Sequence, residues 1–146
     1  AASLGAELVE SLRGTRHEYS LSFACINLLA ALLAQDDAAR ARPVAQQAWA
    51  HADAFELQHA AAAYLALLAA LEGRPRAAVQ LAAYSQALYA ARNEAREQNE
   101  TAATLRAWQL ARRSLDDATC ARLQAEGAAL RDLEIGAIAF GRDDAA

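Results

Sequence analysis

Apolar residues recur at intervals of three and four along nearly the whole chain, and no segment of strand length alternates apolar with polar residues. Intervals of three and four place side chains on one face of an α-helix. The pattern therefore predicts an all-α protein of about seven to eight helices. The first helix is expected to bury Leu4, Leu8, Val9 and Leu12. The second, from about residue 16 to residue 34, is expected to bury Leu21, Phe23, Ala24, Leu28 and Leu32.

The breaks between the first three helices carry conventional boundary signals. Gly14 and Thr15 follow the first helix. Asp36 and Asp37 precede a third helix, where a short carboxylate can accept hydrogen bonds from the free amides of the first turn. A pair of aspartates can also act as general acid and base, but capping explains this pair completely. Pro43 lies early in the third helix, where its missing amide costs less than at the helix centre.

The later helices are predicted from similar signals. Gly73 follows a helix end, and Pro75 takes the first position of the next helix, where an amide donor is not needed. Asp116 or Asp117 caps a seventh helix, and Gly127 closes it. The fourth, fifth and sixth helices are expected over about residues 56–71, 75–92 and 95–115, and a short eighth helix ends near residue 140.

Paired helices joined by tight turns indicate a structural repeat. When residues 24–52 are superposed on residues 61–89, small or apolar side chains coincide in both helices. The coinciding pairs are Ala24 and Ala61, Leu28 and Leu65, Ala41 and Ala78, Ala45 and Ala82, and Ala50 and Ala87. The period is slightly longer than the roughly 34 residues of a tetratricopeptide repeat. We therefore expect residues 1–146 to form one tetratricopeptide-like domain of stacked helical hairpins, wound into a right-handed superhelix.

The composition favours helices packed on small side chains. Of the 146 residues, 55% are hydrophobic but only 6% are aromatic, and the excess is alanine, which has the highest helix propensity. Polar or charged residues interrupt every apolar run before it could span a bilayer, and the start lacks the pattern of a signal peptide. Cys25 and Cys120 have no metal-ligand spacing. We expect a cytoplasmic protein without membrane contact, in which both cysteines are reduced core residues.

Charge and missing residue types exclude several function classes. The net charge of -4, with scattered basic residues, argues against direct nucleic acid contact by this domain. All 14 basic residues are arginine, so the chain has no lysine for a phosphate-binding loop or a Schiff base. No nucleophile or metalloenzyme motif is present, so we expect a non-catalytic protein without a cofactor. Because methionine is absent and the first helix lacks a hairpin partner, we expect the C-terminal part of a longer array.

Several polar and aromatic residues could form a binding site. His51, Asp53 and His59 flank the turn before the fourth helix, but they lack helical pairing and a third strong ligand, so surface or capping roles are favoured over a metal site. Residues 92–100 form the densest polar stretch, which is either a contact surface or a polar linker. The large aromatic residues either line a groove or act as packing wedges in the core; they are Trp49, Tyr64, Tyr84, Tyr89 and Trp108. The candidate interaction surface comprises Asn27, His59, Tyr64, Arg92, Asn93 and Asn99.

Two segments carry a resemblance to a bacterial family. They read LEGRPRAAVQLAAYSQALYAARN over residues 71–93 and LDDATCARLQAEGAALRDLEIGAIAF over residues 115–140. In these segments the chain resembles the C-terminal end of multidomain transcriptional regulators, which join a winged-helix or LuxR-type DNA-binding domain, a signal-transduction ATPase and a tetratricopeptide-like tail. The tail of that family commonly carries "EGRPERAARLLG" and, near its end, "AEGxAL". Ala83 stands where the family often has glycine, and no catalytic residue is carried over.

The resemblance implies a regulatory role for the domain. A tail of this kind receives a small-molecule inducer, a protein partner or a sister subunit, and biases the ATPase between two states. Such a bias requires that the ligand bind the two states with different affinity. The alternative is a free-standing tetratricopeptide scaffold that binds a peptide or protein partner. A regulatory tail and a free-standing scaffold could each also self-associate.

Overall fold

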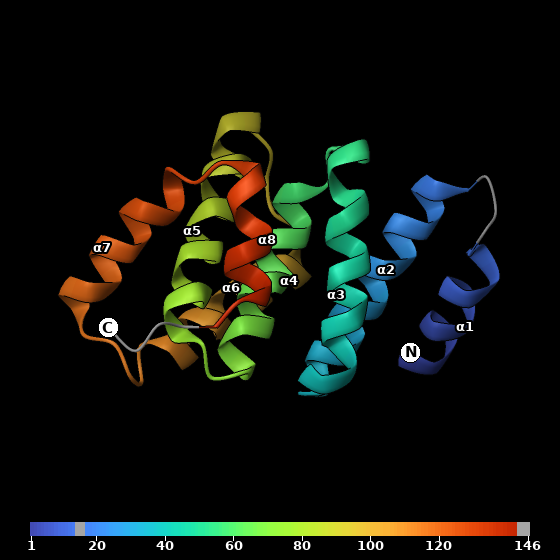
Figure 1. Ribbon diagram of the computed structural model, residues 1–146, viewed down its shortest axis with the longest axis horizontal. Coiled ribbons are helices and arrows are strands. Elements are labelled where there is room, and N and C mark those ends of the chain that lie inside the picture. The colour runs from blue at the N-terminus through green and yellow to red at the C-terminus, as the bar shows by residue number, and fades with distance from the viewer. Residues whose placement is uncertain (14–16, 143–146) are drawn as a thin grey trace.

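The chain is all-α, as the sequence pattern predicts. The structure is a computed structural model that describes residues 1–13 and 17–142, and within these ranges it contains eight α-helices, one 3-10 turn and no strand (Figure 1). The helices are α1 (Ala2–Leu12), α2 (Glu18–Ala34), α3 (Ala38–Ala52), α4 (Gln58–Leu71), α5 (Pro75–Arg92), α6 (Gln98–Ala111), α7 (Asp117–Ala128) and α8 (Asp132–Phe140). The 3-10 turn spans Asp53–Phe55 and links α3 to α4. The predicted break at Gly14 and Thr15 lies outside the described residues.

Helix α4 is the centre of the domain. Every residue from His59 to Ala69 is buried, so this helix is enclosed on all sides. It packs against its sequence neighbours α3 and α5, and also against α2 and α6. On the other side, α5 packs against α7. The result is two layers, with α2, α4 and α6 in one and α3, α5 and α7 in the other; in Figure 1, α3 lies in front of α2 and α5 in front of α6.

Alanines make the close contacts between these helices. Four of the five residue pairs that coincide in the repeat are buried in both members, namely Ala24 and Ala61, Leu28 and Leu65, Ala41 and Ala78, and Ala45 and Ala82. The fifth pair, Ala50 and Ala87, is not among the buried residues. The repeat therefore records packing positions, because a small side chain at a helix contact lets the two backbones approach.

The predicted caps are largely confirmed. Asp37 accepts a hydrogen bond from the Arg40 amide at 3.2 Å, and Asp116 accepts one from the Thr119 amide at 2.7 Å. Gly73 has a φ of 74°, a left-handed conformation that glycine adopts without strain, and Pro75 is the first residue of α5. The sixth helix is shorter than predicted and ends at Ala111.

Three apolar residues lie outside the core where the periodicity placed them inside. Leu4 is 71% exposed, Leu8 is 49% exposed and Phe23 is 42% exposed. In α1 the buried residues are Ala2 and Val9, because α1 packs mainly against α2 over a narrow face. Periodicity identifies an apolar face, but a face is buried only where another element covers it.

Gly127 was predicted to close α7, and this assignment is wrong. Helix α7 continues through Gly127 to Ala128, and the residue after it, Ala129, is in an ordinary right-handed conformation. Gly127 is buried against α5, where a Cβ atom would lie 2.3 Å from the backbone oxygen of Gln80. Gly127 therefore lets α5 and α7 pack closely, and it does not end the helix.

The last helix lies between α3 and α5, on the opposite side of α4 from the contact with α6 (Figure 1). Two arginines hold its C-terminal carbonyl groups. Arg74 donates to Ile138 at 2.9 Å and to Ala139 at 2.6 Å, while Arg42 donates to Phe140 at 2.6 Å. The last carbonyls of a helix have no partner within the helix, so these cations satisfy them and complement the helix dipole. Glu72 pairs with both arginines, at 2.5 Å from Arg42 and 3.5 Å from Arg74.

Candidate functional site

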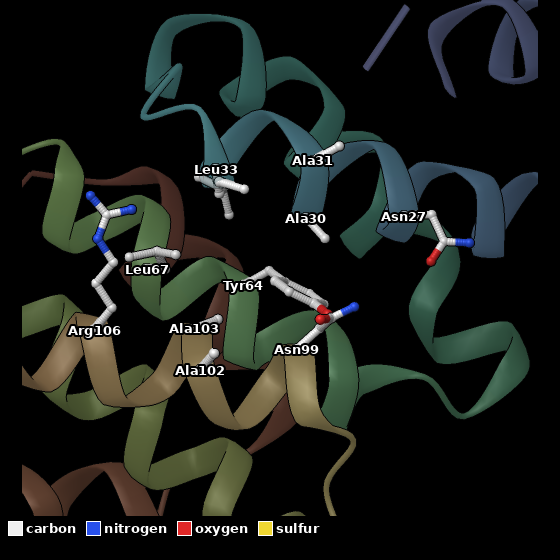
Figure 2. Close-up of a pocket in the computed structure, with 11 residues that line it drawn as sticks. Asn27, Ala30, Ala31, Leu33, Tyr64, Leu67, Asn99, Ala102, Ala103 and Arg106 are labelled. Carbon is white, nitrogen blue, oxygen red and sulfur yellow. The ribbon is translucent and has the colours of Figure 1, made fainter. Parts of the chain in front are cut away.

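A trough runs over α4 between α2 and α6. Its main cavity has a volume of about 380 Å³ and is lined largely by small side chains (Figure 2). Alanines from α2 and α6 form its walls, and Tyr64 and Leu67 of α4 form its base. Polar side chains lie at both ends, with Arg106 at one end and Asn27 and Asn99 at the other (Figure 2). The lining residues are Asn27, Ala30, Ala31, Leu33, Ala34, Tyr64, Leu67, Asn99, Ala102, Ala103 and Arg106.

A second, smaller hollow adjoins the Asn27 end of this cavity. It has a volume of about 170 Å³ and shares Asn27, Tyr64 and Asn99 with the larger one. Its other lining residues are Phe23, Ile26, Leu57, His59, Ala60, Tyr89, Glu94, Ala95, Glu97 and Glu100. We call the two cavities together the trough, and the smaller one the acidic hollow.

Buried hydrogen bonds organise the acidic hollow. Glu100 is only 7% exposed, and its Oε2 atom accepts hydrogen bonds from the Tyr89 hydroxyl group and from the Glu97 amide, the latter at 3.2 Å. The carboxylate of Glu100 thereby fixes the first turn of α6. The rings of His59 and Tyr89 meet edge to face, with centroids 4.8 Å apart. Nε2 of His59 lies 3.4 Å from a carboxylate oxygen of Glu94.

Burial shifts the protonation of the rings that line the hollow. Burial lowers the pKa of His59, and the positive charge of Arg92 lowers it further, against the opposing influence of Glu94 and Glu100. His59 is therefore neutral at pH 7. Burial, with the charge of Glu100 beside it, raises the pKa of Tyr64 to about 12. The imidazole of His59 and the hydroxyl group of Tyr64 are therefore both uncharged at pH 7 where they line the hollow.

Two ion pairs frame the trough. At the Arg106 end, the guanidinium group of Arg106 lies 2.5 Å from Asp36, which precedes α3. At the other end, Arg92 lies 3.0 Å from Glu94, and this hydrogen bond lowers the pKa of Glu94. Asp36 was predicted as a cap, but its left-handed backbone (φ 56°) ends α2 and its side chain points to α6 instead. Charges thus sit at both ends of a largely apolar channel.

The structure brings four of the six candidate residues together. Asn27, His59, Tyr64 and Asn99 come from three helices and line the trough. The other two, Arg92 and Asn93, lie at the end of α5 and line neither cavity. Asn93 ends the helix in a left-handed conformation (φ 52°), which asparagine tolerates better than most residues. Arg92 acts on the site through its ion pair with Glu94 and through its charge, which lowers the pKa of His59.

The sequence analysis missed the burial of Glu100 and left two roles open for Tyr89. Residues 92–100 read as an exposed polar stretch, yet Glu100 is buried and bonded to Tyr89. A signal was available, because Glu97 and Glu100 have the spacing with which the first turn of a helix is capped. Tyr89 read as a packing wedge or a groove residue, and it is both, since it is 6% exposed and lines the acidic hollow.

The structure also bears on the two cysteines, on metal binding and on membrane spans. Cys25 and Cys120 are buried and unbonded to each other. Among residues 1–13 and 17–142, no three side chains of histidine, cysteine, aspartate or glutamate are grouped so as to hold a metal ion. Over the same ranges, no helix is both long and apolar enough to cross a membrane.

Comparison with known proteins yields no relative. The chain matches no family model, no curated protein and no solved structure. The geometry of the trough therefore carries the functional argument.

Proposed function

We propose that this chain is the non-catalytic, ligand-receiving module of a bacterial transcriptional regulator, built as a tetratricopeptide-like array. Its ligand is an elongated small molecule, the inducer, which lies in the trough between α2 and α6. The regulator context comes from the resemblance in residues 71–93 and 115–140. The choice of a small molecule over a protein partner comes from the trough.

One observation carries this proposal, namely a preformed channel with an apolar wall and polar ends. A cavity of about 380 Å³ lies within the range of about 300–1,000 Å³ typical of small-molecule sites. Alanine walls leave room for a ligand stem, while Asn27, Asn99 and Arg106 offer hydrogen bonds at its ends. Such a mixture of apolar lining with a few polar groups is what orients small ligands in their sites.

The position of the trough suits a regulatory role. A ligand in it touches α2, α4 and α6, which belong to three successive parts of the array. Stacked helical repeats change their curvature through small rotations between neighbours. A ligand that prefers one spacing of α2 and α6 therefore favours one curvature, which is the differential binding that a switch needs.

The test is thermal stabilisation of the chain by a panel of metabolites of defined chemical class. A ligand at a hundred times its dissociation constant adds about 2.7 kcal/mol, which raises the melting temperature by roughly 5 °C or more. Each stabilising compound is then measured on Ala102→Trp, which fills the trough from an exposed position on α6. The matched control is Ala121→Trp, at an exposed position of α7 that lines neither cavity.

We expect Ala102→Trp to abolish the stabilisation and Ala121→Trp to preserve it. Compounds that stabilise both variants equally bind elsewhere, and that result refutes the trough as the site. If no compound stabilises the chain but peptides from a displayed random library bind in an Ala102-dependent way, the ligand is a protein segment and the small-molecule proposal fails.

A further inference from the structure

The acidic hollow has an excess of negative charge. Three carboxylates line it, from Glu94, Glu97 and Glu100, and no arginine lines it. Arg92 pairs with Glu94 from outside the lining, which leaves Glu97 and Glu100. Arg96 also lies close by, over the ring of Tyr89 at 5.3 Å from its centroid, and its Nε and Nη2 atoms are buried without a hydrogen-bond partner. One guanidinium group against two carboxylates leaves the hollow formally negative.

Glu100 also has unused bonding capacity. Both hydrogen bonds to its carboxylate end on Oε2, from Tyr89 and from the Glu97 amide. Within the part of the chain that the structure describes, no hydrogen bond ends on its other oxygen, Oε1. A carboxylate that is 7% exposed and lines a cavity presents this oxygen to whatever enters. Oε1 is not among the side-chain atoms that are both fully buried and without a partner, so it is open to water or to a ligand in the hollow.

Aromatic rings line the same space. Phe23, Tyr64 and Tyr89 line the hollow together with the neutral ring of His59. Ring faces attract organic cations within about 6 Å of their centroids, and the attraction is stronger where water is excluded. Carboxylates and ring faces in one cavity select against anions and favour cations that are only weakly hydrated.

From this juxtaposition we infer that the acidic hollow binds an organic cation, an ammonium or guanidinium group carried on an apolar stem that lies along the alanine-walled part of the trough. This inference rests on the proposed function, because it takes the trough as the ligand site. It adds the chemical class of the ligand. The N–H donors of the cation face Glu100 Oε1. The side-chain amides of Asn27 and Asn99 lie beside the cation and can accept or donate hydrogen bonds.

The experiment uses two probes that differ in charge and share a shape, 4-phenylbutylguanidine and the neutral 4-phenylbutylurea. Both are titrated into the isotope-labelled chain, and binding is followed by NMR at the side-chain amides of Asn27 and Asn99. We expect the guanidine to shift these signals with an affinity at least about tenfold above that of the urea, since a charged pair with aromatic contact is worth about that factor. A second pair of probes, a capped pentapeptide with central arginine and its citrulline analogue, distinguishes a peptide source from a free amine.

Variants assign the charge preference to the hollow. Glu100→Gln keeps an acceptor for Tyr89 and a residue suited to the first turn of α6, and we expect it to remove the roughly tenfold preference for the guanidine. Glu97→Gln changes an exposed position and should also weaken the preference for the guanidine over the urea. It replaces Glu100→Gln in the experiment if that variant does not fold. The control is Glu7→Gln, which makes the same change in net charge at an exposed position of α1.

The outcomes separate this inference from the proposed function. Equal binding of the guanidine and the urea, with loss of both in Ala102→Trp, keeps the trough as a ligand site and overturns the cation inference. Absence of binding by all four probes at millimolar concentration, while a neutral or anionic metabolite binds in an Ala102-dependent way, overturns it too. Binding of the arginine peptide alone keeps the cation chemistry and refutes the small-molecule ligand.

Discussion

Substitution of Gly127 by alanine tests a close contact between two helices, α5 and α7. Gly127 lies within α7 and faces α5. A Cβ atom placed there would lie 2.3 Å from the Gln80 backbone oxygen, 2.8 Å from the Gln80 Cα atom and 2.9 Å from the Cβ atom of Ala83. Two of these three atoms belong to the backbone and cannot rotate away. Helices α5 and α7 must therefore separate to admit the methyl group.

The expected magnitude follows from two opposing contributions. Overpacking of a filled contact costs about 1–3 kcal/mol, and the upper end applies because the backbone is what is struck. Replacement of glycine by alanine inside a helix returns about 1 kcal/mol through helix propensity. We therefore expect Gly127→Ala to lower the free energy of unfolding by about 2 kcal/mol.

Gly136 provides the matched control. It also lies inside a helix, α8, but a Cβ atom there would meet only the indole nitrogen of Trp49, at 3.9 Å, which is an ordinary contact. Gly136→Ala should therefore gain the propensity term alone and raise the free energy of unfolding by about 0.5–1 kcal/mol. Urea denaturation followed by far-UV circular dichroism measures both variants. If Gly127→Ala proves as stable as the parent chain, α5 and α7 are not in the described contact and the reasoning is refuted.

Three further predictions concern the polar contacts of the fold. Arg74→Met leaves the carbonyls of Ile138 and Ala139 without donors and should lower the free energy of unfolding by about 2–4 kcal/mol. The exposed control Arg113→Met should change it by less than about 0.5 kcal/mol. Equal effects of the two variants in urea denaturation contradict the described docking of α8. The folded-state pKa of His59 lies below its unfolded value of about 6.5, so the unfolded chain takes up the proton first. The contribution of neutral His59 to the free energy of unfolding should therefore be lost as the pH falls below about 6.5. Above pH of about 6.5, the difference in the free energy of unfolding between the parent chain and His59→Gln should not vary with pH. Tyr84→Phe removes the hydroxyl that donates to Asp132 at the start of α8 and should lower the free energy of unfolding by about 1–2 kcal/mol, while a change within experimental error in the same assay counts against that bond.

The boundaries of the fold were predictable because they depend on local chemistry. The capping aspartates Asp37 and Asp116, the left-handed Gly73 and the first-position Pro75 act within one turn of the chain, and the structure has all four as predicted. Gly127 reads the same way in a sequence as a glycine that ends a helix. Only the approach of α5, distant in sequence, distinguishes its role.

The site was predictable only in part, for a related reason. Asn27, His59, Tyr64 and Asn99 could be recognised as polar or aromatic residues in an alanine-rich chain, but nothing local shows that they meet. Burial of Glu100 depends on Tyr89 of the preceding helix, so a residue in a polar stretch becomes part of the interior. Docking of α8 likewise depends on Arg42 and Arg74, which lie 98 and 65 residues before the carbonyl groups that they bind.

The same geometry explains why the trough is suited to change shape when it is filled. Helices α2 and α6 are held mainly through α4, and the ion pair of Asp36 with Arg106 ties the α6 side directly to the end of α2. Both side chains of that pair are more than one third exposed, and exposed pairs contribute about 0–1 kcal/mol. A ligand that bridges α2 and α6 shifts their spacing only by the difference between its affinities for two spacings. A tenfold difference in affinity corresponds to about 1.4 kcal/mol, which exceeds the contribution of this ion pair.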